Sequence, residues 1–129
     1  MNNARIIQCG LCFAALLAAL TLTQLNQAQA MAPNYRLVVS FISFASGIDD
    51  KAKDEIDQYI ARYERKRRVR LAKEKVYWGM EGEIDYCFRL SELQPDRQKA
   101  FIAGIRSLAA KSKQVSVSEN AHCHNKRQN

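Results

Sequence analysis

Acidic side chains and an indole ring lie close together in one glycine-flanked segment of the sequence, and such groups can bind cations or move protons. Trp78 opens the segment, and Glu81, Glu83 and Asp85 follow it. They could bind a hard cation through oxygen, or a cationic ligand against the indole, together with Ser46, Asp49 and Asp50 of an earlier loop. Alternation along a strand would also place Glu83, Asp85 and Arg89 in a row on one sheet face. The two carboxylates of that row could act as an acid and a base if burial separated their pKa values.

Two cysteines in the second half of the sequence offer sulfur chemistry. The chain has four cysteines, of which two lie in the N-terminal apolar region and two are Cys87 and Cys123. An even pair in an oxidising compartment predicts a disulfide between Cys87 and Cys123. Closing a loop of about 36 residues would contribute on the order of 3 to 4 kcal/mol to stability.

Metal-ligand residue types lie side by side near the C-terminal end. His122 and His124 flank Cys123, and imidazole and thiolate are good ligands for copper or zinc. Three consecutive residues cannot easily close a tetrahedral site alone, and a disulfide would leave only the histidines. We therefore expect no cofactor, with metal binding through His122 and His124 as an alternative.

A dense basic run occupies the middle of the chain. It contains Arg65, Lys66, Arg67, Arg68 and Arg70. Such a run suggests nucleic acid in a cytoplasmic protein. An exported protein would instead meet anionic lipid headgroups, envelope polysaccharide or an acidic protein surface. Because cations are also favourable at a helix C-terminus, a structural role is the stronger interpretation of the run taken by itself.

The first 30 residues have the pattern of a cleavable secretory signal peptide. Arg5 precedes an apolar stretch over 11–22, and a polar run ends in Ala28-Gln29-Ala30. The apolar stretch is shorter than the roughly 20 residues that span a bilayer. We expect cleavage after Ala30, no transmembrane anchor in the mature form, and a periplasmic or secreted protein. Removal of Arg5 lowers the formal charge from +7 to +6.

Residues 31–129 predict one α+β domain. Apolar periodicity and turn signals give a strand over 36–44, a helix over 51–67, strands over 70–78 and 83–90, a helix over 95–111 and a strand over 114–119, with a polar tail from about 120. This order favours a ferredoxin-like βαββαβ sandwich, with two helices on one face of a four-stranded antiparallel sheet. The first and third strands would be central.

The predicted topology has consequences for residues that are distant in sequence. The loop over 46–50 should lie at the same end of the sheet as the hairpin over 78–83. A bridge from Cys87 to Cys123 requires the C-terminal tail to fold back, because linked Cα atoms lie within about 7 Å. If Leu37, Val39 and Phe41 face the helices, Val38, Ile42 and Phe44 lie on the other face of the sheet.

The sequence favours an exported, non-catalytic interaction module. Exposed apolar area on the open sheet face, or the basic run, would engage a protein partner or an anionic envelope component. A homodimer formed by sheet-to-sheet packing is one form of this hypothesis. The alternative is a small periplasmic hydrolase or metal-binding protein that uses Glu83, Asp85 and Arg89, or the two histidines with Cys123. Because solvated polar sheet faces are common, we expect no catalytic residue.

Overall fold

A computed structural model describes residues 33–126 of the chain. The predicted signal peptide, residues 1–30, and the predicted mature start at Met31 lie outside the described residues. Neither helix of the described part has the length and apolar character needed to cross a membrane.

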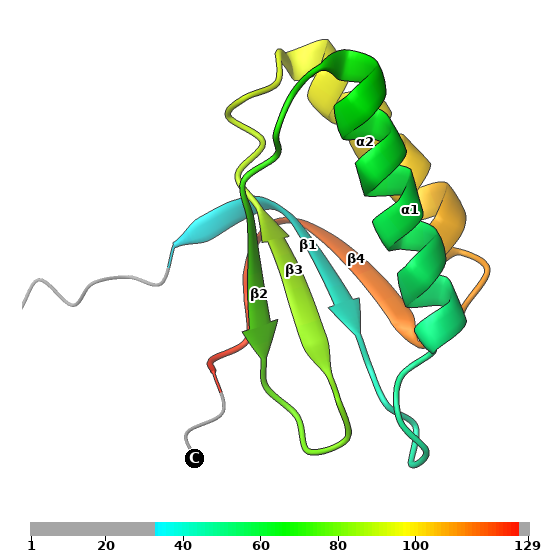
Figure 1. Cartoon of the computed structure of the whole chain (residues 1–129). Coiled ribbons are helices and arrows are strands. Elements are labelled where there is room, and N and C mark those ends of the chain that lie inside the picture. The colour runs from blue at the N-terminus through cyan, green and yellow to red at the C-terminus, as the bar shows by residue number, and fades with distance from the viewer. Residues whose placement is uncertain (1–32, 127–129) are drawn as a thin grey trace, which may run out of the picture. The chain divides into compact units, whose positions relative to one another are not determined.

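The described residues form one four-stranded antiparallel sheet and two helices, which confirms the α+β class. The elements are β1 (Asn34–Phe41), α1 (Asp50–Arg67), β2 (Lys73–Tyr77), β3 (Ile84–Phe88), α2 (Pro95–Ala109) and β4 (Val115–His122). The strands lie in the order β2-β3-β1-β4, so the first and third strands are central as predicted. Both helices lie on the same side of the sheet (Figure 1).

Local signals explain where the helices begin and end. Asp49 caps α1, because its carboxylate accepts a hydrogen bond of 2.9 Å from the backbone N–H of Ala52. The helix ends at Arg67, and Arg68 takes a left-handed conformation with φ 52°. Pro95 is the first residue of α2, where its missing N–H costs no helical hydrogen bond.

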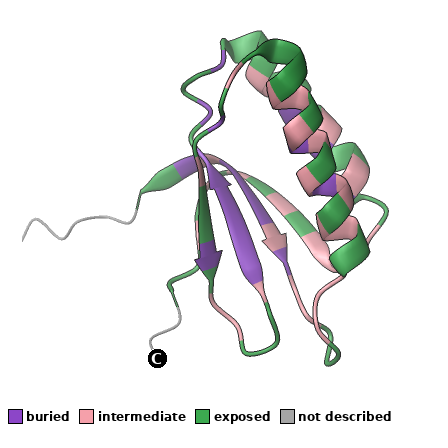
Figure 2. Ribbon diagram, viewed as in Figure 1, coloured by how far each residue is buried: buried purple, intermediate pink, exposed green. Residues whose placement is uncertain are grey.

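The main core lies between the helices and one face of the sheet. Leu37, Val39 and Phe41 of β1 face the helices, which is the orientation that puts Val38 on the other face of the sheet. Tyr86 and Phe88 of β3 are buried in the same cluster. The remaining buried members are Ile56, Ile60, Leu71, Ile84, Leu90, Leu93, Phe101, Ile102 and Ile105. Figure 2 shows the buried positions on the central strands and on the sheet-facing sides of the helices.

A second, smaller cluster covers the opposite face of the sheet. Tyr35, Val38, Val76 and Cys87 are buried there. The expectation that Val38 is exposed is therefore wrong, because Ala121 and Cys123 pack against this cluster. We call residues 121–126, the end of β4 and the residues after it, the C-terminal segment. The strand also ends at Phe41, so Ile42 and Phe44 do not continue its face.

The last strand is longer than the sequence predicted. Its pairing with β1 continues through Tyr35↔Ala121 and Asn34↔His122, beyond the predicted strand end at residue 119 and into the polar segment. The predicted strand ended at residue 119 because the alternation of apolar and polar residues that includes Val115 and Val117 stops there. Backbone pairing with a neighbouring strand needs no apolar side chains, and the strand therefore extends into a polar segment.

Candidate functional site

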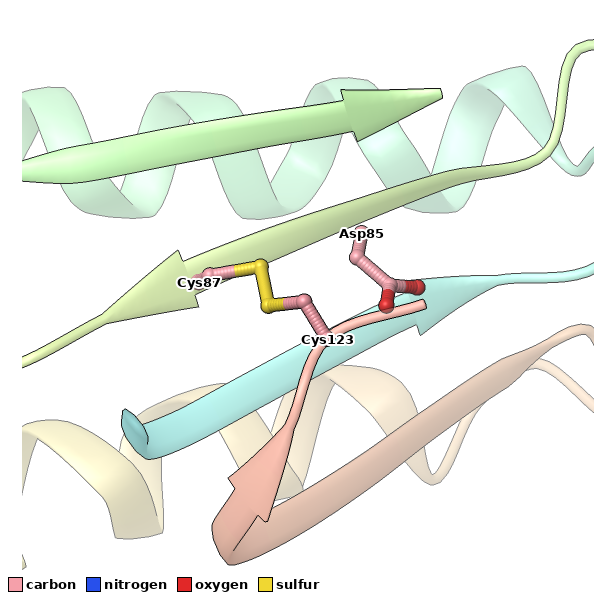
Figure 3. Close-up of side chains that lie close together, drawn as sticks. All are labelled: Asp85, Cys87 and Cys123. Carbon is pink, nitrogen blue, oxygen red and sulfur yellow. A yellow bond between two sulfur atoms is a disulfide. The ribbon is translucent and has the colours of Figure 1, made fainter. Parts of the chain in front are cut away.

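A disulfide joins the end of the chain to the open face of the sheet. Cys87 lies on β3 and Cys123 directly follows β4, with their Cα atoms 6.4 Å apart. The strand between β3 and β4 is β1, so the segment after β4 must cross β1 to reach β3. Figure 3 shows the bridge between this segment and β3. The predicted pairing and the predicted return of the tail are both confirmed.

Asp85 lies beside the disulfide and is fully buried. Its Oδ1 accepts a hydrogen bond of 2.9 Å from the indole Nε1 of Trp78. Its Oδ2 accepts one of 2.9 Å from the backbone N–H of His124 and lies 2.9 Å from the Nδ1 of the same residue. A buried carboxylate needs such donors to replace water, and here the C-terminal segment supplies part of them.

The rings of Trp78 and His124 stack on each other. Their centroids are 3.9 Å apart and their planes differ by 19°. Trp78 directly follows β2, while His124 directly follows Cys123, so the disulfide places the imidazole against the indole. The imidazole is thereby fixed by a ring contact, a buried carboxylate and a neighbouring covalent bridge, although half of its side-chain surface is exposed.

The predicted polar row of Glu83, Asp85 and Arg89 is buried only at Asp85, because Glu83 and Arg89 flank β3 and Arg89 is exposed. Asp85 and Cys87 are buried under the C-terminal segment, which the local alternation could not reveal. Glu83 accepts a hydrogen bond of 2.7 Å from the backbone N–H of Glu81 in its own turn. The Arg89 guanidinium lies 5.7 Å from the centroid of the Tyr35 ring.

These contacts separate the proposed acid and base. In the part of the chain that the structure describes, Asp85 accepts hydrogen bonds from Trp78 and His124, and from neither Glu83 nor Arg89. Among the predicted binding residues, the structure joins the side chains of Trp78 and Asp85. The side chains of Glu81, Glu83 and Arg89 make their contacts elsewhere.

The two histidines have separate surroundings. The Nδ1 of His122 lies 3.3 Å from the carbonyl oxygen of Pro33, whereas His124 contacts Asp85 and Trp78. Within residues 33–126, the group of potential ligand atoms lying within 4.8 Å of one another comes from Asp85, Cys87 and Cys123. The sequence analysis did not combine Asp85 with the cysteines. The signal that would have found this group was the return of the tail across the sheet, which brings Cys123 to β3.

The two loops at the hairpin end of the sheet lie together, as predicted. The Ser43 hydroxyl donates a hydrogen bond to the Glu81 carboxylate and accepts one of 3.1 Å from the backbone N–H of Gly47. Gly47 has φ +87°, a conformation that side chains with a Cβ rarely adopt. Phe44 and Met80 of these loops are 61% and 84% exposed, so this end carries apolar surface.

The basic run is exposed at the end of α1. We call Arg65, Lys66, Arg67, Arg68 and Arg70 the basic patch, and all five are exposed. The one acidic neighbour on this turn, Glu64, uses its carboxylate to accept a hydrogen bond of 2.8 Å from the backbone N–H of Leu71. A shallow depression runs along this surface between Ala61 and Arg70.

The sequence analysis missed a partly buried polar cluster on the helix-covered face of the sheet. The Tyr86 hydroxyl donates a hydrogen bond of 2.9 Å to Asp57, which also pairs with Lys53 at 3.0 Å and Lys73 at 3.3 Å. Burial, and then the bond to Asp57, raise the pKa of Tyr86 to about 12. Burial acts against the charge of Asp57, but hydrogen bonds from Lys53 and Tyr86 hold its pKa below the usual range. The cluster ties α1 to the sheet with a protonated tyrosine.

Comparisons with protein-family models, curated proteins and solved structures found no match for the chain. The function is therefore argued from the residues and their geometry alone.

Proposed function

We propose that this protein is an exported, non-catalytic binding module of ferredoxin-like topology that engages an anionic component of the cell envelope through its basic patch. The observation that carries the proposal is the free charge of the patch. Five exposed cations gather within six residues, and none of the ion pairs among residues 33–126 involves a member of this patch.

Surface cations that form no ion pair attract polyanions more strongly than cations that are paired with a carboxylate. Several charges of one sign within a Debye length of about 8 Å raise the local concentration of a polyanion. At a membrane with anionic lipids, each basic residue near the surface contributes about 1 kcal/mol. Arg65, Lys66 and Arg67 lie on the last turn of α1, whereas Arg68 and Arg70 lie beyond its end. The charges therefore extend past the helix along the chain.

Export is supported by the N-terminal sequence pattern and by the cysteine pair. Residues 1–30 have the three-part organisation of a secretory signal. A disulfide between Cys87 and Cys123 is typical of proteins that work in an oxidising compartment. Both observations favour an envelope ligand over nucleic acid.

The hydrolase alternative receives less support from the geometry. The carboxylate of Asp85 is occupied by Trp78 and His124, and Glu83 is bound within its own turn. A homodimer through the open sheet face is also weakened, because the buried Val38 does not offer an apolar surface there.

Vesicle sedimentation tests the proposal. Wild-type protein should bind vesicles that contain phosphatidylglycerol and phosphatidylethanolamine, and should not bind phosphatidylcholine alone. The triple variant Arg65→Glu, Arg67→Glu, Arg68→Glu should bind roughly a hundredfold more weakly, because three contributions of about 1 kcal/mol are lost.

The matched control is a second triple variant that changes the net charge by the same amount, at positions outside the basic patch. Lys99, Lys113 and Lys126 are exposed outside the basic patch, and their replacement by glutamate should weaken binding far less than the patch variant. Equal losses in the two triple variants would show that binding follows net charge alone and would contradict a localised patch.

A further inference from the structure

Three potential metal ligands converge on the open face of the sheet. The ligand atoms of Asp85, Cys87 and Cys123 all lie within 4.8 Å of one another. Asp85 and Cys87 project from β3 on the same face, while Cys123 arrives with the segment after β4 (Figure 3). Two thiolates and a carboxylate are ligand types that zinc accepts.

His124 lies next to this group but outside it. Its Nδ1 is 2.9 Å from the Oδ2 of Asp85, and it follows Cys123 directly in the chain, so it would complete a tetrahedral set by moving toward the two sulfurs once the bridge is broken. Zinc bonds of about 2.0 to 2.3 Å in a tetrahedron separate the ligand atoms by roughly 3.3 to 3.8 Å. The nitrogen and the carboxylate oxygen are thus already near the spacing that a shared zinc ion requires.

The surroundings would orient these ligands. The Trp78 indole donates a hydrogen bond to Oδ1 of Asp85, and the backbone N–H of His124 donates one to Oδ2, the oxygen that also lies 2.9 Å from Nδ1 of the His124 ring. Stacking on Trp78 also restricts rotation of the His124 ring. Hydrogen bonds and packing of this kind fix ligand orientation in metal sites and strengthen binding.

We propose that reduction of the Cys87–Cys123 disulfide converts this face into a zinc site made of Cys87, Cys123, Asp85 and His124. A dithiol supplies two electrons and two protons: the S–S bond breaks, two S–H bonds form, and the dithiol becomes a disulfide. Zinc then replaces the two thiol protons, which pass to water, and binds Nδ1 of a neutral His124 ring that carries its one proton on Nε2. The C-terminal segment is therefore tied to β3 by a covalent bond in the oxidised protein and by the metal in the reduced protein.

The position of the bridge makes the reduction feasible. Cys87 is buried, but Cys123 is only partly buried, and a shallow depression reaches Cys87 along the edge of β2. An attacking thiolate needs access to one sulfur of the bridge. The proposal does not depend on the basic patch, which lies at the end of α1 and just beyond it.

Zinc titration of the reduced chain tests the proposal. The full chain should carry Cys9→Ser and Cys12→Ser in every sample, so that Cys87 and Cys123 are the only thiols. Under anaerobic conditions the reduced protein should bind one zinc ion in competition with a chromophoric chelator, and the oxidised protein should bind none. Cobalt should give a thiolate charge-transfer band and the visible bands of a tetrahedral ion.

Variants separate the proposed site from binding by thiols alone. His124→Ala and Asp85→Asn should each weaken zinc binding about tenfold or more, whereas His122→Ala should change it by less than about twofold. Circular dichroism should show that zinc leaves the reduced protein folded.

Three results would overturn the proposal. They are the absence of equimolar zinc binding by the reduced protein, a reduced protein that stays unfolded with zinc, and unchanged affinity in both His124→Ala and Asp85→Asn.

Discussion

Replacement of Asp85 by asparagine is the perturbation that the described contacts define best. The carboxylate is fully buried and accepts hydrogen bonds from the Trp78 indole and from the backbone of His124, with the His124 ring at the same distance. Asparagine keeps the shape but has one acceptor oxygen and an NH₂ group. Whichever way the amide turns, an N–H of Trp78 or of His124 then faces another donor.

The expected loss of folding stability can be worked out from these contacts. A hydrogen bond to a charged acceptor contributes about 1.5 to 3 kcal/mol, and a buried donor left unpaired costs about 1 to 3 kcal/mol. Because Trp78 and His124 are only partly buried, water can satisfy part of what is lost. We expect Asp85→Asn to lower the free energy of unfolding by about 2 to 4 kcal/mol, a large share of the 5 to 15 kcal/mol typical of a domain.

Urea denaturation measures this loss directly. Trp78 is the only tryptophan of the chain and stacks on His124, so its fluorescence reports the site itself. The matched control is Asp54→Asn, since Asp54 is exposed on α1 and should change stability by less than about 0.5 kcal/mol. If Asp85→Asn also lowers the free energy of unfolding by less than about 0.5 kcal/mol, the Asp85 carboxylate does not stabilise the fold as we propose.

Three further predictions follow from other contacts. Cys123→Ser should lower the free energy of unfolding in urea by about 3 to 4 kcal/mol through the lost loop closure, and an unchanged midpoint would contradict the bridge. Tyr86→Phe should cost about 1 kcal/mol at neutral pH. Because the pKa of Tyr86 is raised to about 12 in the folded protein, wild-type stability should fall more steeply than that of the variant as pH rises from about 10 to 12. Hydrogen bonds from Arg106 and Arg36 lower the pKa of Glu119, so its stabilisation is present above the ordinary glutamate pKa and is lost on acidification. Glu119→Gln should therefore show a smaller loss of stability in thermal unfolding between pH 6 and pH 3, and an identical loss would count against the pairing.

The arrangement of the elements could be predicted because it depends on local patterns. Alternation in β1 and β3 identified the face that Leu37, Val39 and Tyr86 present to the helices. Asp49 and Pro95 marked the helix starts through their capping chemistry. The pairing of Cys87 with Cys123 followed from parity and the predicted compartment, since residues 31–129 contain no other cysteine.

The candidate site could be predicted only in part because it depends on contacts between distant segments. His124 and Asp85 are 39 residues apart, and nothing in the local pattern of β3 distinguishes a buried carboxylate from a solvated one. The same reason explains the error at Val38, whose burial depends on the returning C-terminal segment. The bond between Tyr86 and Asp57 likewise joins a strand to a helix across 29 residues.

The most direct test of the proposed function locates the bound surface on the protein. Isotope-labelled protein would be titrated with bicelles containing phosphatidylglycerol while the backbone amide resonances are followed by NMR. The account predicts shifts or line broadening concentrated at residues 65–70 and suppressed by added salt. Changes centred on residues 78–85 and 122–126, or no change at any bicelle concentration, would contradict it.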